Sequence, residues 1–271
     1  MASILDRMPT PLRRRRNVSQ PPPPPPVESE ESFVEMTLQE HLEELRKRIL
    51  YSAVSVLVAL GIGLWLSGSV LEIMANHAQS PGERLQVISP TEGFVTYFKV
   101  ALYIAIAIAM PVLVYQIMAF IFPGLTKGER KYVMLSVPFV MILFVGGVTF
   151  AFFVLVPRAL DFLSGFGSSY FEWNPRAEEI ISFYMRLMLG VGIIFQLPLV
   201  MYIPARIGII GWRRYAKFRK YAIILAMIAA AIITPTPDPF NMMLVAVPTY
   251  VLFELGILLS MTVRKTIRTA S

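Results

Sequence analysis

Cysteine is absent from the 271 residues of this chain, and histidine occurs only at His41 and His77. The absence of cysteine excludes disulfides and thiol chemistry, and the sequence has no HExxH or GxSxG motif. It also lacks a phosphate-binding Gly-rich loop, and its connecting segments are too short for a nucleotide-binding domain. We therefore expect no enzyme activity, no metal site and no cofactor.

Charged side chains are scarce as well. They make up 16% of the residues, against about a quarter in soluble domains, while 55% are hydrophobic and the mean hydropathy is +0.60. Most of the apolar stretches reach the ~17–25 residues that a helix needs to cross a bilayer. They lie at 49–66, 95–122, 133–156, 180–204, 222–233 and 240–261. Because a chain in lipid must satisfy its own backbone hydrogen bonds, this pattern predicts an all-α polytopic membrane protein with six transmembrane helices.

Positive charge is concentrated in alternate connecting segments. Of the 25 lysines and arginines, twenty lie before the first stretch, in the second and fourth connections and in the C-terminal tail. By the positive-inside rule these segments are cytoplasmic, and so are both termini. This placement explains the basic pI of about 9.7 without a nucleic-acid partner, and we expect none.

The chain divides into three parts by composition. Residues 1–34, with four consecutive arginines and six consecutive prolines, are predicted to be a disordered cytoplasmic tail that touches anionic lipid. Residues 35–262 form the transmembrane domain, and 263–271 form a short basic tail. The longer connections, 67–94 and 157–179, are expected to be loops on the far side of the membrane.

The segment 222–233 is shorter than the others. At 1.5 Å per residue its twelve residues cover about 18 Å, and a Pro-rich run from Thr234 to Pro239 ends any helix there. Either this helix is short and the bilayer thins around it, or 222–261 is a re-entrant hairpin. We favour thinning because the last stretch is long enough to return across the membrane.

Polar residues inside the spans are costly and therefore candidates for function. Gln116 lies near the cytoplasmic end of the second span, Gln196 precedes Pro198 in the fourth, and Glu254 lies in the sixth. Gln196 is either an interhelical hydrogen-bonding group or a functional one. Glu254 is a proton site, a buried partner for a cation, or a residue that holds helices together or lies near the interface.

Two carboxylates stand out on the basic cytoplasmic face. Glu44 lies four residues before Arg48 in a strongly helix-forming segment, and Glu129 is the only acid in its loop. Such acids either neutralise their neighbours or bind an incoming cation. A guanidinium is the best-matched cation, since its planar fork donates two parallel hydrogen bonds to a carboxylate.

Several motifs resemble one family. The segment HLEELRKR at 41–48 resembles the HLxELRxR opening of TatC, the multispanning receptor subunit of the twin-arginine protein translocase. Further similarity lies in SPTEGF at 89–94 with Lys99, in YQIMAFIFPGL at 115–125 with Glu129-Arg130, in FQLP at 195–198, in TPTPD at 234–238, and in PTY at 248–250 with Phe253-Glu254. The resemblance covers about 36–262.

The resemblance implies a glove-shaped bundle of six helices whose last two are short. It implies that Glu44 and Glu129 hold the paired arginines of a signal peptide, with Arg46 and Arg130 nearby and with Phe120 and Pro123 shaping the loop. Family members often carry Glu at position 196, so Gln196 keeps hydrogen bonding but not protonation. Further candidates for the groove or for partner contacts are Gln116, Asp238 and Glu254.

We therefore interpret the chain as the signal-peptide receptor of a system that exports folded proteins across the cytoplasmic membrane. The implied partners are twin-arginine signal peptides, single-span subunits of the TatA and TatB type, and membrane lipids, in an oligomeric complex driven by the proton gradient. The alternatives are a secondary transporter of a small solute, which would need a charged midplane site, and a scaffold without substrate binding.

Overall fold

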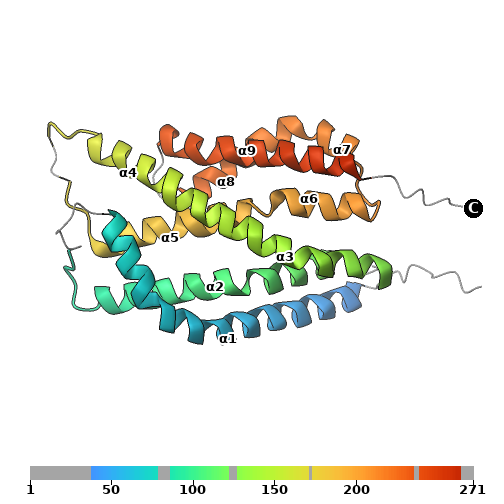
Figure 1. Ribbon diagram of the computed structural model, residues 1–271, viewed down its shortest axis with the longest axis horizontal. Coiled ribbons are helices and arrows are strands. Elements are labelled where there is room, and N and C mark those ends of the chain that lie inside the picture. Colours follow the sequence, from blue (N-terminus) through green and yellow to red (C-terminus); the bar gives the residue numbers. More distant parts are fainter. Residues whose placement is uncertain (1–37, 79–85, 122–126, 171–172, 235–237, 264–271) are drawn as a thin grey trace, which may run out of the picture. The chain divides into compact units, whose positions relative to one another are not determined.

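The computed structural model describes residues 38–78, 86–121, 127–170, 173–234 and 238–263, without the side chains of 38 and 127–133. All regular elements of this part of the chain are helices (Figure 1). They are α1 (Leu38–Ala78), α2 (Glu92–Ile121), α3 (Lys127–Phe150), the π-helical turn η1 (Ala151–Leu155), α4 (Val156–Gly165), α5 (Ala177–Ile194), α6 (Leu197–Arg206), α7 (Trp212–Lys217), α8 (Arg219–Ile233) and α9 (Pro239–Thr262). The predicted tails lie outside the described residues, apart from Val263.

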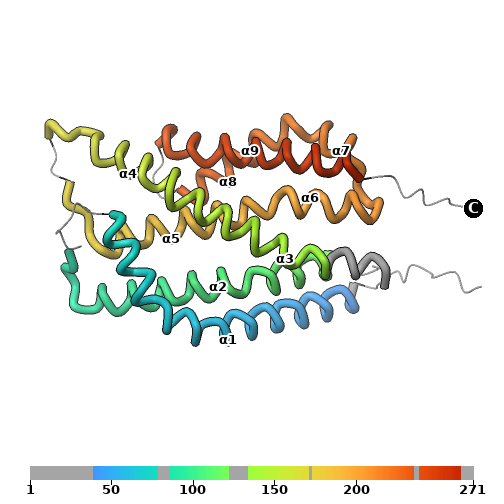
Figure 2. Tube along the Cα trace, in the orientation of Figure 1, coloured from blue at the N-terminus to red at the C-terminus, as the bar shows by residue number. Residues whose placement is uncertain are grey.

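Helices α1 and α2 pack side by side along most of their length, as the tube in Figure 2 shows. Their close approach depends on Gly63, because a Cβ atom there would lie 2.3 Å from the backbone oxygen of Ala101. Small residues at helix contacts in membranes allow backbones to come this near. The pair therefore forms a fixed unit at the N-terminal side of the transmembrane domain.

The last third of α1 bends away from the line of its first part (Figure 1). Two side chains donate hydrogen bonds to the carbonyl oxygen of Leu64 near the bend: Ser67 Oγ at 2.9 Å and Tyr97 Oη at 2.7 Å. Donors that compete for a helical carbonyl loosen the ladder locally, and Ser–Gly pairs such as Ser67-Gly68 are common bend positions. The helix continues to Ala78, so the prediction of a loop from residue 67 was wrong for 67–78.

A second long rod consists of α3, η1 and α4. The π-helical turn is closed by a hydrogen bond from the backbone N–H of Val156 to the carbonyl of Ala151, and both residues are fully buried. Pro157 follows at the start of α4, where a missing N–H is tolerated. The predicted loop 157–179 is therefore helical as far as Gly165, which corrects that boundary.

The fourth apolar stretch is broken where Pro198 predicts a kink. Helix α5 ends at Ile194, Phe195 and Gln196 form a tight turn, and α6 starts at Leu197. Helix α5 is the central helix of the domain, with Ile181, Tyr184 and Leu187 fully buried against α2, η1 and α9. These buried side chains are uncharged, whereas Glu179 and Arg186 of the same helix are exposed.

Five helical segments are long and apolar enough to cross a membrane, and α8 is not among them. Helix α8 has 15 residues, or about 22 Å, as the short segment 222–233 predicts. Helix α9 packs on α6 and α8 and has 24 residues, or about 36 Å. The expectation that the last two helices are both short therefore holds for α8 and was wrong for α9.

Candidate functional site

A chain of polar contacts joins the start of α1 to the end of α2. The Arg48 guanidinium donates one hydrogen bond to Glu44 Oε1 at 3.0 Å and another to Gln116 Oε1 at 2.9 Å. The predicted pairing of Glu44 with Arg48, one helical turn apart, is confirmed. The link to Gln116, 68 residues away, fixes the end of α2 against this carboxylate.

The second oxygen of Glu44 has no such partner. Oε2 is buried and accepts no hydrogen bond from the residues whose side chains the structure describes. A buried acceptor left without a donor costs about 1–3 kcal/mol, and more when it is charged. Glu44 therefore keeps one acceptor position that a further cationic donor would satisfy.

Two aromatic rings meet one helical turn before this carboxylate. The rings of His41 and Phe120 stack with centroids 4.6 Å apart and planes 17° apart, so the last turn of α2 covers the first turn of α1. Arg46 is exposed and pairs with none of the described residues. The structure thus brings together Glu44, Gln116 and Phe120, three of the residues that the sequence singles out.

The other members of the predicted set lie on the connection that follows and at the start of α3, so the prediction that Glu129 lies in a loop was wrong. Glu129 and Arg130 belong to the first turn of α3, and their side chains are among those not described. Pro123 lies outside the described residues. Only five residues separate Ile121 from Lys127, so the backbone carrying Glu129 returns close to the end of α2.

Gln196 occupies a different contact. It is 3% exposed, and its amide nitrogen donates to the carbonyl oxygens of Val140 in α3 at 3.2 Å and of Gly192 in α5 at 3.4 Å. The predicted interhelical hydrogen bond is confirmed. Its Oε1 atom is buried and has no hydrogen-bond donor within the described part of the chain.

Asp238 and Glu254 both have structural partners. Asp238 caps α9, accepting a hydrogen bond from the backbone N–H of Asn241 at 2.7 Å. Both oxygens of Glu254 accept from Arg219 at 2.8 Å, and the hydroxyl of Tyr250 donates to the same carboxylate at 2.9 Å. Of the roles left open for Glu254, the structure shows the partner of a cation.

One polar junction was missed by reasoning from the sequence. Glu92, 4% exposed at the start of α2, accepts backbone N–H groups from Ile88 at 2.9 Å, Ser89 at 3.2 Å and Glu178 at 3.2 Å. It joins the connection before α2 to the start of α5. The only signal was its position in the SPTEGF motif, which gives no hint of Glu178, 86 residues away.

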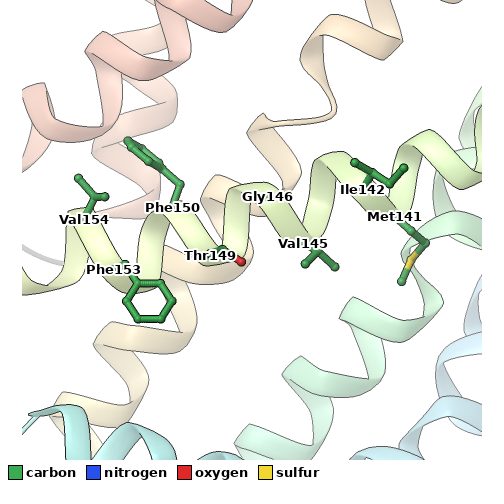
Figure 3. Close-up of a pocket in the computed structure, with 8 residues that line it drawn as sticks. All are labelled: Met141, Ile142, Val145, Gly146, Thr149, Phe150, Phe153 and Val154. Carbon is green, nitrogen blue, oxygen red and sulfur yellow. The ribbon is translucent and has the colours of Figure 1, made fainter.

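A wide apolar hollow lies along α3 and η1 (Figure 3). Figure 3 shows that its eight labelled residues come from one continuous helical segment, and Thr149 is the only one with a polar side chain. A ligand site needs several polar groups that converge from different elements. Among the described residues there is also no group of three or more His, Cys, Asp or Glu side chains fit to hold a metal ion.

Comparison with known proteins supports the resemblance. The family model for the Sec-independent protein translocase protein (TatC) matches residues 40–248. The TatC of Carboxydothermus hydrogenoformans is 36% identical over 225 residues, covering 83% of this chain and 93% of the relative. The chloroplastic TATC of Pisum sativum is 34% identical over 214 residues, 79% of this chain and 61% of that protein.

The fold agrees as well. A crystal structure described as the twin arginine translocase receptor TatC superposes with a TM-score of 0.70 at 35% identity, covering 82% of this chain and 98% of that one. A second structure, of the same receptor in the detergent DDM, gives a TM-score of 0.72 at 34% identity, over 82% and 99%.

The protein is therefore a multi-pass helical membrane protein with a polar junction between its first two helices. The chain belongs to the TatC family of Sec-independent protein translocase proteins. It is a component of the twin-arginine translocase, and thus a transport protein rather than an enzyme. The solute-carrier and scaffold alternatives are not supported.

Proposed function

We propose that this chain receives the twin-arginine signal peptides of exported folded proteins, and that Glu44 and Glu129 each bind one arginine. The observation that carries the proposal is the buried Oε2 atom of Glu44, which lacks a donor among the described residues. A guanidinium entering there would satisfy this oxygen through a charge-assisted hydrogen bond.

The surroundings of Glu44 suit such a guest. Arg48 donates to the other oxygen of this carboxylate and is itself held by Gln116, so the orientation of Glu44 is set before the peptide arrives. Phe120 and Pro123 shape the connection that leads to the second acid at the start of α3, and Arg46 and Arg130 act as nearby cations. The positive charges of Arg46 and Arg130 set the spacing of the two incoming arginines by repulsion. Since the attraction is electrostatic at an accessible face, it weakens as salt is added.

The topology proposed here has six spans, with α8 as the short fifth crossing and a bilayer that thins around it. The protein lies in the inner membrane of the cell. The lysine and arginine bias supports a cytoplasmic position for both termini, including the tails 1–34 and 263–271. The apolar part of the signal peptide follows the paired arginines into the groove between helices, toward Gln196.

Single-span partner subunits of the TatA and TatB type then assemble with several copies of this chain, and the proton gradient drives transport. Gln196 supports this proposal through its amide oxygen, which is buried without a donor among the described residues and remains able to accept one from a neighbouring helix. Asp238 and Glu254 contribute by holding α8 and α9 in place rather than by touching the peptide.

The test is binding of a twin-arginine peptide to the purified full chain. The double variant Glu44→Ala/Glu129→Ala should lose detectable binding while membrane insertion stays intact. Glu43→Ala is the matched control, because Glu43 is exposed on the same turn of α1 and forms no ion pair or hydrogen bond with the described residues. Near-normal binding by the double variant would reject these residues as the receptor site.

A further inference from the structure

A second hollow, which is polar, lies at the other end of α2, away from Glu44. It encloses about 510 Å³ between α2, α4 and α5, within the ~300–1,000 Å³ usual for small-molecule sites. Two cations and two carboxylates line it: Lys99, Arg186, Glu178 and Glu179. Apart from Ser182, its other walls are apolar or aromatic and include Trp173. This mixture of charges and apolar surface differs from the apolar hollow on α3.

Lys99 and Arg186 lie at similar distances from the starts of their helices. The hydrogen bond from Glu178 N–H to Glu92 sets the first turns of α2 and α5 level with each other. Lys99 lies seven residues beyond Glu92, and Arg186 eight residues beyond Glu178, which places both about 10–12 Å along their helices. Both are therefore inside segments long and apolar enough to span a membrane.

Only one of these cations is neutralised within the described chain. Lys99 forms an ion pair with Glu178. Arg186 is exposed on α5 and forms no ion pair or hydrogen bond with any described residue. A guanidinium within a spanning helix is costly, and such residues pair or extend toward the interface. Arg186 thus lacks an anion among the described residues, and a ligand could supply one.

The anion that best fits Arg186 is a phosphate, which a guanidinium binds through two parallel hydrogen bonds. Glu179 lies seven residues earlier on α5, on the same helical face and nearer the end of the helix. In a membrane phospholipid the phosphate lies deeper than the headgroup amine, which is the order of Arg186 and Glu179 along α5. The apolar side chains of Leu160, Leu163 and Phe183 would border the acyl chains.

We propose that this hollow binds a glycerophospholipid with a primary-amine headgroup, its phosphate on Arg186 and its ammonium on Glu179. Trp173 is an exposed aromatic residue in the lining of the hollow, and aromatic side chains commonly mark the membrane interface. The proposal is independent of signal-peptide binding, since none of these residues belongs to the site around Glu44.

The experiment measures phospholipid retention by the purified full chain, using native mass spectrometry after exchange into vesicles of phosphatidylethanolamine, phosphatidylglycerol or phosphatidylcholine. Wild type should retain phosphatidylethanolamine most strongly. Arg186→Gln should lower this retention about tenfold, as expected for loss of charged hydrogen bonds. Arg158→Gln is the matched control, because Arg158 is exposed on α4 and does not line the hollow. Retention by this control should equal that of wild type.

Two further variants separate the parts of the proposal. Glu179→Gln should erase the preference for phosphatidylethanolamine over phosphatidylglycerol while keeping phosphate binding. Arg186→Lys keeps the charge but loses the planar fork, so its retention should fall between wild type and Arg186→Gln.

Three outcomes would overturn the proposal. The first is equal phosphatidylethanolamine retention by wild type and Arg186→Gln. The second is displacement of the lipid by millimolar inorganic phosphate, which would indicate a site for the free anion. The third is that Arg186→Gln keeps its lipid but loses a co-purifying membrane subunit, which would assign Arg186 to an acidic residue of a partner.

Discussion

Glu44 and Glu254 are both paired with an arginine, but the two pairs are completed to different degrees. Glu254 uses both oxygens on Arg219 and takes a third hydrogen bond from Tyr250. Glu44 gives one oxygen to Arg48, and its other oxygen is buried without a donor among the described residues. A saturated carboxylate fixes helices, whereas one with an open acceptor is prepared for a ligand. The difference distinguishes a structural pair from a receptor site.

The largest expected effect comes from exchanging each carboxylate for its isosteric amide. Glu44→Gln should weaken binding of a twin-arginine peptide about tenfold or more, since a hydrogen bond to a charged group is lost. Glu254→Gln should leave binding within about twofold of wild type, because its carboxylate is already saturated. It should instead lower the melting temperature by leaving Arg219 without its partner. Peptide titration measures the affinity of each variant, and thermal unfolding in detergent measures its melting temperature. Equal loss of binding in the two variants would remove the distinction.

The next largest effect is expected from disrupting the close contact between α1 and α2. Gly63→Ala places a Cβ against the backbone of Ala101, which cannot move aside as a side chain can. We expect a loss of about 1–3 kcal/mol of stability, as in other overpacked sites, with weaker peptide binding because Arg48 and Gln116 move apart. Gly61→Ala is the control, since nothing lies within 4 Å of a Cβ there. Thermal unfolding compares the stability of the two variants. Equal melting temperatures would contradict the close contact at Gly63.

A smaller effect tests how Glu44 is oriented. Gln116→Leu removes the acceptor for one Arg48 nitrogen, so the Glu44 carboxylate loses part of its support. A net hydrogen bond of this kind contributes about 0.5–1.5 kcal/mol, and affinity for the peptide should fall roughly threefold. The same titration with a peptide whose arginines are replaced by lysines shows whether the loss concerns the guanidinium. An unchanged affinity would mean that Gln116 only packs.

Local patterns predicted much of the architecture. Apolar length predicted the five helical segments that are long enough to span a membrane, Pro198 marked the break between α5 and α6, and the Glu44–Arg48 spacing predicted their ion pair. Helix ends were less predictable: α1 runs to Ala78 and α4 to Gly165, because isolated glycines and serines do not stop a helix that is packed on its neighbours.

The contacts that define the sites depend on residues far apart in the chain. Arg48 meets Gln116, Arg219 meets Glu254, and Glu92 meets the backbone of Glu178. No periodicity or spacing encodes these distances, since they follow from how whole helices pack. For the same reason the sequence identified Glu254 as a candidate without revealing that Arg219 saturates it.

The most direct test is the structure of the full chain with a bound twin-arginine peptide, determined in a lipid nanodisc by electron microscopy. The distance to measure joins the peptide guanidinium nitrogens to Glu44 Oε2. We expect about 2.7–2.9 Å, the length of a charge-assisted hydrogen bond, with the second arginine on Glu129. A complex in which both guanidiniums lie elsewhere, and Glu44 still contacts only Arg48, would contradict the proposed receptor site.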